Sequence, residues 1–469
     1  MSLGGRPSAR GDVSSGDLPP GLLQEVYRQI LERAPEHDLV PSLDRIQAVT
    51  GLLGDPQRSF GVIHLTGTNG KTSTTRMVER LLREHGLRTG RFLSPHLSDM
   101  RERISIDGSP VDPEQFVGAY DEVLPYLRLI DARTAEQGGP RLTFFEVLVA
   151  MAYAIFADTP VDVAAIEVGM GGSWDATNVA DGSVAVVTPI AVDHQRFLGR
   201  DVATIAAEKA GIIKPGAFAV LARQTEAAAE QLVRRAAQVQ ATIAREGVEF
   251  GVLSREVAVG GQQLVLQGLS GVYDEIFLPL HGSYQASNAA CALAAVEAFL
   301  GARSGEPDGT AGDLDAELVR AAFADVDSPG RLEVVRRSPT VLVDAAHNPA
   351  GAAVLAQALQ ESFGFSRLIG VVGVLVDKDA EGILDALEPV FDQVVITRSS
   401  SPRSMPPEQL AELAEEIFGD DRVHVEQHLY QAMDVAIGLA EAGGDYGAGV
   451  LATGSVTVAA DVRALFGAA

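Results

Sequence analysis

The stretch Leu65-Thr-Gly-Thr-Asn-Gly-Lys-Thr-Ser73 decides the fold of this chain. The apolar run Phe60-Gly-Val-Ile-His-Leu65 precedes it and predicts a strand, while the residues from Lys71 to about Arg83 have the spacing of a helix. Strand, glycine-rich turn, Gly-Lys-Thr and helix form the layout of a phosphate-binding loop. The usual pattern has a further glycine at the position of Leu65, so these residues alone leave a nucleotide site and an ordinary loop as alternatives.

The chemistry of such a loop suits ATP. Glycines let backbone N–H groups approach phosphate oxygens, and the helix start contributes a positive dipole end. Lys71 would add a full charge, and the Thr72 hydroxyl is placed to bind Mg²⁺. We expect the ATP phosphates to lie against Gly67, Thr68, Asn69, Gly70, Lys71, Thr72 and Ser73.

Length, charge and cysteine content limit the classes of protein to which this chain can belong. A chain of 469 residues is long enough for two to four domains. Its net charge of −26 argues against nonspecific binding of nucleic acid or of an anionic membrane. The single cysteine, Cys291, excludes an intramolecular disulfide and a cysteine-based zinc site. We see neither a secretory signal nor an apolar run of about 20 residues, so we expect a cytoplasmic protein.

The element pattern predicts an α/β protein with two alternating units. The first, at 21–326, is a P-loop ATPase domain with a mainly parallel sheet, and it includes a small antiparallel sheet from four short apolar runs at 247–280. A surface loop at 301–312 precedes a smaller Rossmann-like domain at 330–469, and residues 1–20 read as a disordered tail. Strands are predicted at 61–66, 88–93, 162–168, 184–189, 332–336, 340–344, 368–373, 393–397 and 449–452, and helices at 21–33, 71–84, 113–135, 143–157, 201–210 and 284–300.

Polar residues follow several predicted strands, which is where open α/β sheets place ligands. Glu167 ends the run Val161–Val168, and a glutamate in an apolar strand needs a partner, which favours a Mg²⁺ ligand over a capping carboxylate. Asp193-His194 follows the run Val184–Val192, and we favour a place beside the phosphates for His194 over a structural one.

Three other residues are ambiguous by themselves. Ser94 ends a strand, but a simple turn residue is the leading interpretation. Lys209 lies in a helical pattern, where a lysine usually faces solvent. Asp344 follows a strand in Val341-Leu-Val-Asp-Ala-Ala-His-Asn-Pro349, and it suits small-molecule recognition and turn formation equally.

Taken together, these motifs resemble the folylpolyglutamate synthase/dihydrofolate synthase family, a branch of the Mur ligase superfamily. The resemblance covers nearly all of residues 22–469, and the motifs keep the family order. They are Gly67-Thr-Asn-Gly-Lys-Thr72, Ser94-Pro-His-Leu97, Thr143-Phe-Phe-Glu146, Glu167-Val-Gly-Met-Gly-Gly172, Asp175-Ala-Thr-Asn178, Asp193-His194, Glu208-Lys-Ala-Gly-Ile-Ile-Lys214, Gln285-Ala-Ser-Asn288, Pro329-Gly-Arg331 and Asp344-Ala-Ala-His-Asn-Pro349.

The resemblance implies an ATP-dependent carboxylate–amine ligase of the bacterial bifunctional type. Such enzymes transfer the ATP γ-phosphate to a carboxylate, and the amine of L-glutamate then attacks the acyl phosphate. The implied acids are tetrahydrofolate, which receives polyglutamates, and dihydropteroate. One or two Mg²⁺ ions are implied as cofactors, K⁺ is a further candidate, and a monomer is the family expectation.

The resemblance also implies roles for individual residues. It makes Lys209 a carbamylated lysine, which reverses its solvent-facing interpretation. It assigns catalysis to Lys71, His194, Lys209 and His347; metal contacts to Thr72, Ser94, Glu167 and His194; nucleotide contacts to Asn288, Arg331 and Asp344; pterin contacts to Thr143, Phe145, Asp175 and Ala176; and glutamate contacts to Asp344 and His347.

One loop departs from the family pattern. The family usually has Gly-Gly-Arg before the hydrophobic residue and Asp-Ala-Thr-Asn, whereas this chain has Gly171-Gly172-Ser173-Trp174. The missing arginine removes a cation near the pterin loop, which bears on the substrate rather than on the reaction class. Trp174 is the only tryptophan, so its fluorescence is expected to report pterin binding.

Two other functions compete with this interpretation. A peptidoglycan Mur ligase shares the ATP chemistry but generally carries an N-terminal domain of about 100 residues, for which the loop at Gly67 leaves no room in this sequence. A P-loop switch without ligase activity would have no need of the motif Asp344–Pro349.

Overall fold

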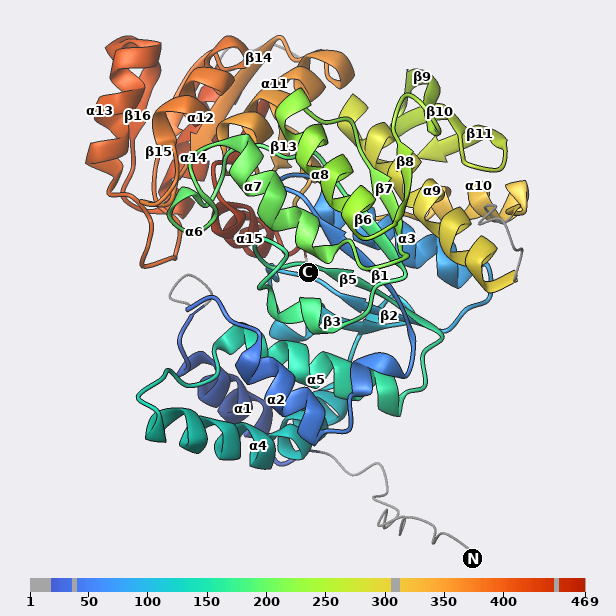
Figure 1. Ribbon diagram of the computed structural model, residues 1–469. Coiled ribbons are helices and arrows are strands. Elements are labelled where there is room, and N and C mark those ends of the chain that lie inside the picture. Colours follow the sequence, from blue (N-terminus) through green and yellow to red (C-terminus); the bar gives the residue numbers. More distant parts are fainter. Residues whose placement is uncertain (1–17, 36–39, 305–312, 443–446, 469) are drawn as a thin grey trace, which may run out of the picture.

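The structure is a computed structural model that describes residues 18–35, 40–304, 313–442 and 447–468. Most of the predicted tail at 1–20 therefore lies outside the described residues. Within these ranges the strands form three sheets of eight, three and six strands. Figure 1 shows the six-stranded sheet and its helices beside the eight-stranded one, and the predicted α/β class is confirmed.

The eight-stranded sheet carries the phosphate-binding loop. Its order is β4-β3-β2-β5-β1-β6-β7-β8, parallel from β2 to β8 and antiparallel at the β3–β4 edge. β1 lies in the middle, where strands are buried on both faces. The bounds are β1 (Gly61–Thr66), β2 (Thr89–Phe92), β3 (Ile104–Ile106), β4 (Ser109–Pro110), β5 (Val163–Glu167), β6 (Val184–Val187), β7 (Phe218–Leu221) and β8 (Thr242–Arg245).

Strand β6 is shorter than predicted. The sequence predicts a strand at 184–189, within a run that reaches Val192, but β6 ends at Val187, because Pro189 has no N–H to donate to a neighbouring strand. Asp193 and His194 therefore follow a loop.

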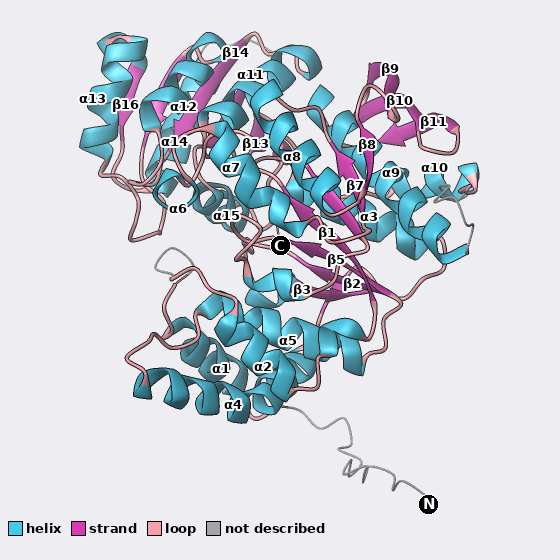
Figure 2. Ribbon diagram, in the orientation of Figure 1, coloured by secondary structure: helices cyan, strands magenta, loops and turns pink. Residues whose placement is uncertain are grey.

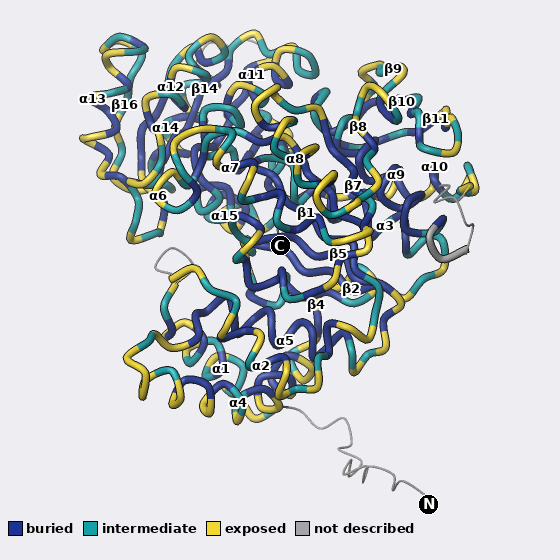
Figure 3. The backbone as a smooth tube through the Cα atoms, viewed as in Figure 1, coloured by how far each residue is buried: buried dark blue, intermediate teal, exposed yellow. Residues whose placement is uncertain are grey.

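Helices cover both faces of this sheet (Figure 2). On one face α1, α2, α4 and α5 pack against β1, β2 and β5, and α7 and α8 pack against β6 and β7. On the other face α3, α9 and α10 enclose Ile63 and Leu65 of β1, and Figure 3 shows β1 and α9 deeply buried. No helix of the described residues is long and apolar enough to cross a membrane. The bounds are α1 (Leu22–Leu31), α2 (Asp44–Leu52), α3 (Lys71–Glu84), α4 (Pro113–Glu136), α5 (Phe144–Asp158), α6 (Gln195–Leu198), α7 (Val202–Lys209), α8 (Glu226–Gln238), α9 (Ser283–Ser304) and α10 (Ala316–Ala324).

The small antiparallel sheet has three strands rather than the four predicted: β9 (Gly251–Ala258), β10 (Gly261–Gln267) and β11 (Val272–Leu278). Two predicted runs belong to one strand, because Ser254 and Arg255 pair with β10 instead of turning. The predicted loop at 301–312 is also partly wrong, since α9 continues to Ser304 and only 305–312 lie outside the described residues.

The second α/β unit is a six-stranded sheet in the order β12-β13-β17-β14-β15-β16, with β12 antiparallel to its neighbour and the rest parallel. The sequence missed β16, whose three residues are too few for a periodic signal. The bounds are β12 (Glu333–Arg337), β13 (Thr340–Val343), β14 (Arg367–Val372), β15 (Gln393–Ile396), β16 (Val423–Val425), β17 (Ala448–Thr453), α11 (Pro349–Ser362), α12 (Ala380–Leu387), α13 (Pro407–Phe418), α14 (Leu429–Ala442) and α15 (Val456–Leu465).

The linker between the two units, residues 325–332, is held against α3 by two ion pairs. Arg80 Nε lies 3.0 Å from Asp325 Oδ2, and Arg76 Nη1 lies 2.9 Å from Asp327 Oδ1. Both arginines stand on α3, the helix that begins at the predicted phosphate-binding loop, so the linker is docked against that helix.

Candidate active site

The phosphate-binding loop needs glycine at two positions for steric reasons. Gly67 (φ +146°) and Gly70 (φ +89°) adopt the left-handed backbone region that side chains disfavour. A Cβ atom on Gly67 would lie 1.9 Å from Thr188 Oγ1, and one on Gly70 would lie 2.5 Å from Asn288 Oδ1. The loop is therefore held closely between β6 and α9, and the N-terminus of α3 opens at its end.

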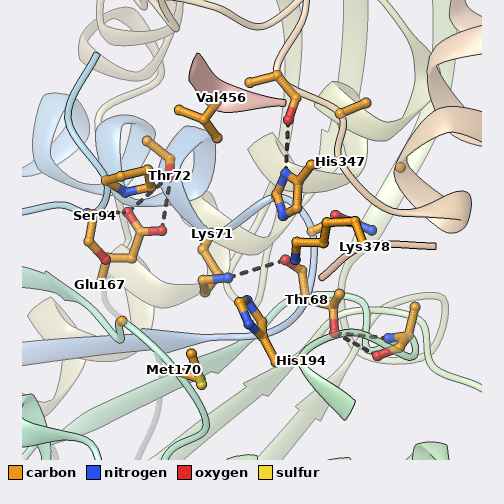
Figure 4. Close-up of a pocket in the computed structure, with 18 of the residues that line it drawn as sticks. Thr68, Lys71, Thr72, Ser94, Glu167, Met170, His194, His347, Lys378 and Val456 are labelled. Carbon is orange, nitrogen blue, oxygen red and sulfur yellow. Dashed lines mark hydrogen bonds between the residues drawn. The ribbon is translucent and has the colours of Figure 1, made fainter. Parts of the chain in front are cut away.

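Lys71 folds back over this loop (Figure 4). Its Nζ donates to Gly67 O at 3.2 Å and to Thr68 O at 3.1 Å. Burial lowers the pKa of Lys71, while the carboxylates of Glu167 and Asp193 oppose that shift. The ammonium thus stands at the mouth of the loop, where it can meet a phosphate.

Glu167 meets Thr72 and Ser94 at the end of β5. Thr72 Oγ1 donates to Glu167 Oε1 at 3.0 Å and to Oε2 at 3.1 Å, and the Ser94 N–H donates to Oε2 at 3.4 Å. Burial raises the pKa of Glu167. A carboxylate with nearby hydroxyls is an all-oxygen donor set that fits Mg²⁺. Because no three His, Cys, Asp or Glu residues cluster for a metal in the described part of the chain, such an ion would also draw on hydroxyls and water.

Asp193 links the two units. Its Oδ1 lies 2.5 Å from Lys378 Nζ, and its Oδ2 accepts from Asn348 Nδ2 at 3.1 Å and lies 3.4 Å from His347 Nε2. Burial alone would raise the pKa of Asp193, but His347, His194 and Lys378 hold it well below its usual range. Asp193 is therefore an ionised anchor for three groups of the second unit.

The amides of Asn69 and Asn348 form a second link between the units. Each Nδ2 donates to the other side chain's Oδ1 at 3.1 Å, and Asn348 also caps α11 by accepting from Gly351 N at 2.8 Å. The phosphate-binding loop is thus in direct contact with the second unit.

His194 and Lys209 lie around a small cavity that Lys71 also lines. Burial lowers the pKa of His194 to about 3, so this imidazole is neutral. Lys209, the last residue of α7, is buried, and its Nζ donates to Gly67 O at 2.7 Å. Burial, helped by the charge of Lys71, lowers the pKa of Lys209 to about 7. The solvent-facing interpretation of this lysine is wrong.

The segment 169–179 contributes Gly169, Met170, Trp174, Asp175 and Ala176 to the lining of a large cavity. We call this segment the substrate loop, after the role that the family resemblance implies. Asp175 begins the 3₁₀ turn Ala176–Val179, accepting from Thr177 N, and also accepts from Met170 N, both at 2.9 Å. Thr143 caps α5 in a reciprocal arrangement with Glu146. A Cβ atom on Gly169 would lie 2.5 Å from Phe145 Cζ, so the loop packs directly on that ring.

The loop position that lacks the family arginine has a structural contact. Ser173 Oγ donates to Glu208 O at 3.0 Å, and Glu208 Oε1 accepts from Gly172 N and Trp174 N, both at 3.3 Å. The substrate loop is thereby docked on the end of α7, next to Lys209.

Four further predicted residues have identified places. Ser73 Oγ lies 2.9 Å from Ser328 Oγ in the linker, and Asn288 Nδ2 donates to Gln285 Oε1 at 3.0 Å. Asp344 accepts from Leu332 N and Ala346 N, both at 2.8 Å, so its carboxylate holds the turn at the end of β13. Arg331 lines the cavity from the second unit.

One cavity of about 790 Å³ contains most of the predicted site. Gly67 and Lys209 instead line a cavity of about 30 Å³ beside it, with Lys71, His194 and His347. The predicted residues that line the large cavity are Thr68, Asn69, Gly70, Lys71, Thr72, Ser73, Ser94, Thr143, Phe145, Glu167, Asp175, Ala176, His194, Asn288, Arg331, Asp344 and His347.

Sequence reasoning missed Lys378 and gave no separate role to Asp193 or Asn348. The latter two lie within quoted motifs, so their signal was present. Lys378 stands in Val376-Asp-Lys-Asp379 after β14, where only its place near a strand end could have drawn notice.

Comparison with known families gives two matches. Residues 139–296 match the Mur ligase middle domain, and residues 330–456 match the Mur ligase glutamate ligase domain.

Comparison with individual proteins extends this result. The chain is 52% identical to a dihydrofolate synthase/folylpolyglutamate synthase of Mycobacterium tuberculosis, over 98% of this chain and 97% of that protein. The M. tuberculosis folylpolyglutamate synthase solved with ADP and AMPPCP is 52% identical and superposes with a TM-score of 0.89 over 95% of this chain and 98% of that one. An Escherichia coli FolC solved with DHPP and ADP is 29% identical, with a TM-score of 0.80 over 95% and 98%.

Proposed function

Because the chain belongs to the folylpolyglutamate synthase/dihydrofolate synthase family of Mur-type ligases, we propose that one active site adds L-glutamate both to tetrahydrofolate and to dihydropteroate. The enzyme is an ATP-dependent ligase, and the identity over nearly the whole length favours the folate branch over a peptidoglycan ligase or a P-loop switch. The observation that carries the proposal is the cavity of about 790 Å³, which is lined by residues of both the phosphate-binding loop and the substrate loop. The proposed domain bounds are 21–326 and 330–469.

The reaction must bring two anions together. The acid carboxylate attacks the γ-phosphorus, ADP leaves, and the glutamate amine then displaces phosphate from the acyl phosphate through a tetrahedral intermediate. Lys71 is placed to offset charge on the transferring phosphoryl group. Bound Mg²⁺, held by Thr72, Ser94, Glu167 and His194, would neutralise phosphate charge.

The second unit would bring glutamate to the acyl phosphate. His347 lines the cavity beside Asp193 and is the proposed glutamate contact. Asp344 would act through the turn that it holds, because both of its oxygens already accept backbone N–H groups. Asn288 and Arg331 are the proposed nucleotide contacts.

A direct test is the substrate dependence of ADP release. We expect ADP to appear only when ATP, an acid and L-glutamate are all present, with labelled glutamate incorporated into both tetrahydrofolate and dihydropteroate. Dihydropteroate is also expected to change Trp174 emission, because that side chain lines the cavity. Steady ATP hydrolysis that ignores both other substrates would contradict the ligase assignment.

Lys209 is expected to form a carbamate. An amine reacts with CO₂ only when neutral, releasing one proton, and a lysine with a pKa of about 7 is largely neutral above that pH. At fixed dissolved CO₂, the carbamate signal in ¹³C NMR should therefore grow between about pH 6 and pH 8, and removal of CO₂ should lower activity.

The other lysines provide the controls. The chain has four lysines, at 71, 209, 214 and 378. Lys209→Met should remove the carbamate signal, whereas Lys214→Met should keep it. A signal that survives in the Lys209 variant would place the carbamate elsewhere.

A further inference from the structure

Strand β1 contacts both loops of the active site. Its last residue, Thr66, leads directly into the phosphate-binding loop. On the same face of the strand, Thr66 Oγ1 donates to Gly171 O at 2.8 Å, and His64 Nε2 lies 2.8 Å from Thr177 Oγ1. Both β1 side chains are fully buried, so each of these contacts is made without competing water.

The neighbours of His64 determine where its proton lies. Thr177 Oγ1 donates to Asp175 Oδ1 at 2.5 Å, and the two oxygens of the Asp175 side chain also accept from Thr177 N and Met170 N, both at 2.9 Å. The hydroxyl must then accept from His64, which therefore carries its proton on Nε2. Burial, with the nearby charge of Lys214, lowers the pKa of His64 to about 3, so the ring stays neutral.

This order of donors makes a directed chain into the substrate loop. His64 donates to Thr177, Thr177 donates to Asp175, and Asp175 accepts from Met170 N at 2.9 Å on its other oxygen. Neither His64 nor Thr66 is among the described residues that line the large cavity. The two side chains can therefore act on a substrate only through the loop.

We propose that His64 and Thr66 are positioning residues for the acid substrate, which fix the substrate loop to the strand that carries the phosphate-binding loop. Because both loops are attached to the same strand, β1, this arrangement holds the acid carboxylate opposite the γ-phosphate of ATP. Misplacement of reacting groups by about 1 Å can cost about a hundredfold in rate. This inference rests on the proposed role of the substrate loop in pterin binding.

Matched pairs of variants test the inference. Thr66→Val removes the hydroxyl at constant shape, and Thr66→Ser keeps it. His64→Met removes the donor, and His64→Gln restores an N–H the same number of bonds from Cβ. We expect Thr66→Val and His64→Met to raise the Kd for dihydropteroate, read from Trp174 emission, by about tenfold each, since each leaves a buried acceptor unpaired. The KM for ATP should stay near the wild-type value, and the Ser and Gln variants should recover most of the affinity.

Thr397→Val is the control for loss of a buried hydroxyl. Thr397 is fully buried, and its Oγ1 has no hydrogen-bond partner in the described structure, so this change should leave dihydropteroate binding unaltered. Thermal unfolding of each variant establishes that it folds. If His64→Met does not fold, Thr66→Val alone tests the inference.

The outcomes separate the two levels of the proposal. If wild-type protein binds dihydropteroate and Thr66→Val and His64→Met bind it equally well, the positioning role of His64 and Thr66 is overturned, while the proposed pterin site stands. The positioning role is also overturned if these variants weaken the binding of ATP and of dihydropteroate to the same extent. If dihydropteroate leaves the wild-type Trp174 emission unchanged, the proposed pterin site fails, and this inference fails with it.

Discussion

Lys71→Ala is expected to abolish formation of the acyl phosphate, with a fall in kcat of at least about 10³-fold. The ammonium stands within hydrogen-bond distance of the loop carbonyls at Gly67 and Thr68, next to the place where we propose that the ATP phosphates bind. Trapping of the acyl phosphate with hydroxylamine measures the first chemical step directly. Folate binding should remain within about threefold of wild type, because Lys71 Nζ donates to Gly67 and Thr68 of the phosphate-binding loop and not to the substrate loop.

The Lys71 variant is expected to fold. Burial disfavours the charged ammonium, as its lowered pKa indicates, so removing it relieves a cost to the folded state. Arg83→Ala is the matched control: it removes a cation from α3 outside the cavity and should leave kcat near wild type. Hydroxamate formed at the wild-type rate by Lys71→Ala would refute the assigned role.

Asp193→Ala is expected to disrupt the contact between the two units. The side chains of Asp193 and Lys378 are only 8% and 7% exposed, so the change leaves a buried ammonium without its counter-ion, at a cost of about 3–5 kcal/mol. It also removes the acceptor for Asn348. We expect kcat/KM to fall by about 10²-fold or more, because His347 and Lys378 lose their fixed place beside Asp193 in the cavity.

The double variant Asp193→Ala with Lys378→Met separates charge from geometry. Removing both charges should recover much of the stability in denaturant unfolding without recovering activity. The pH dependence has a definite sign. Because the folded pKa of Asp193 lies below the unfolded value of about 3.9, its stabilisation is present above that pH and is lost as the pH falls through the acid range. Additive effects of the two single changes would show that Asp193 and Lys378 do not interact.

Local patterns predicted the central part of the fold. The strand before the phosphate-binding loop and the helix after it were placed to the residue, because a buried strand, a glycine turn and an amphipathic helix follow one another without a gap. The sequence missed the short strands β3, β4, β7, β8 and β16, of two to four residues each, and the helices α2, α8 and α10. Nothing in the local pattern showed that Ser254 and Arg255 continue a strand, and a three-residue strand such as β16 is too short to leave a period.

The site was predicted mainly from the family resemblance, and pairings between distant residues were not. Helical spacing at Lys209 does not say which way its side chain faces, which depends on α7 packing against the phosphate-binding loop. The contact of Lys378 with Asp193 joins residues 185 positions apart in two sheets. Only the folded arrangement reveals such a pair.

The docking of the linker on α3 has a consequence for how the two halves meet. A free tether would let the second unit explore a wide volume, whereas Arg76 and Arg80 hold Asp327 and Asp325 against α3. Beyond these ion pairs only a few residues around Gly330 lead into β12, and Gly330 is itself held there, since its N–H donates to Glu333 Oε2 at 2.7 Å and its carbonyl accepts from Ala345 N at 2.9 Å. A shorter tether raises the local concentration of His347 and Lys378 at their partners, which for short flexible links is about millimolar. We therefore expect the docked linker to favour the contacts of His347 and Lys378 with Asp193 by keeping them intramolecular and close.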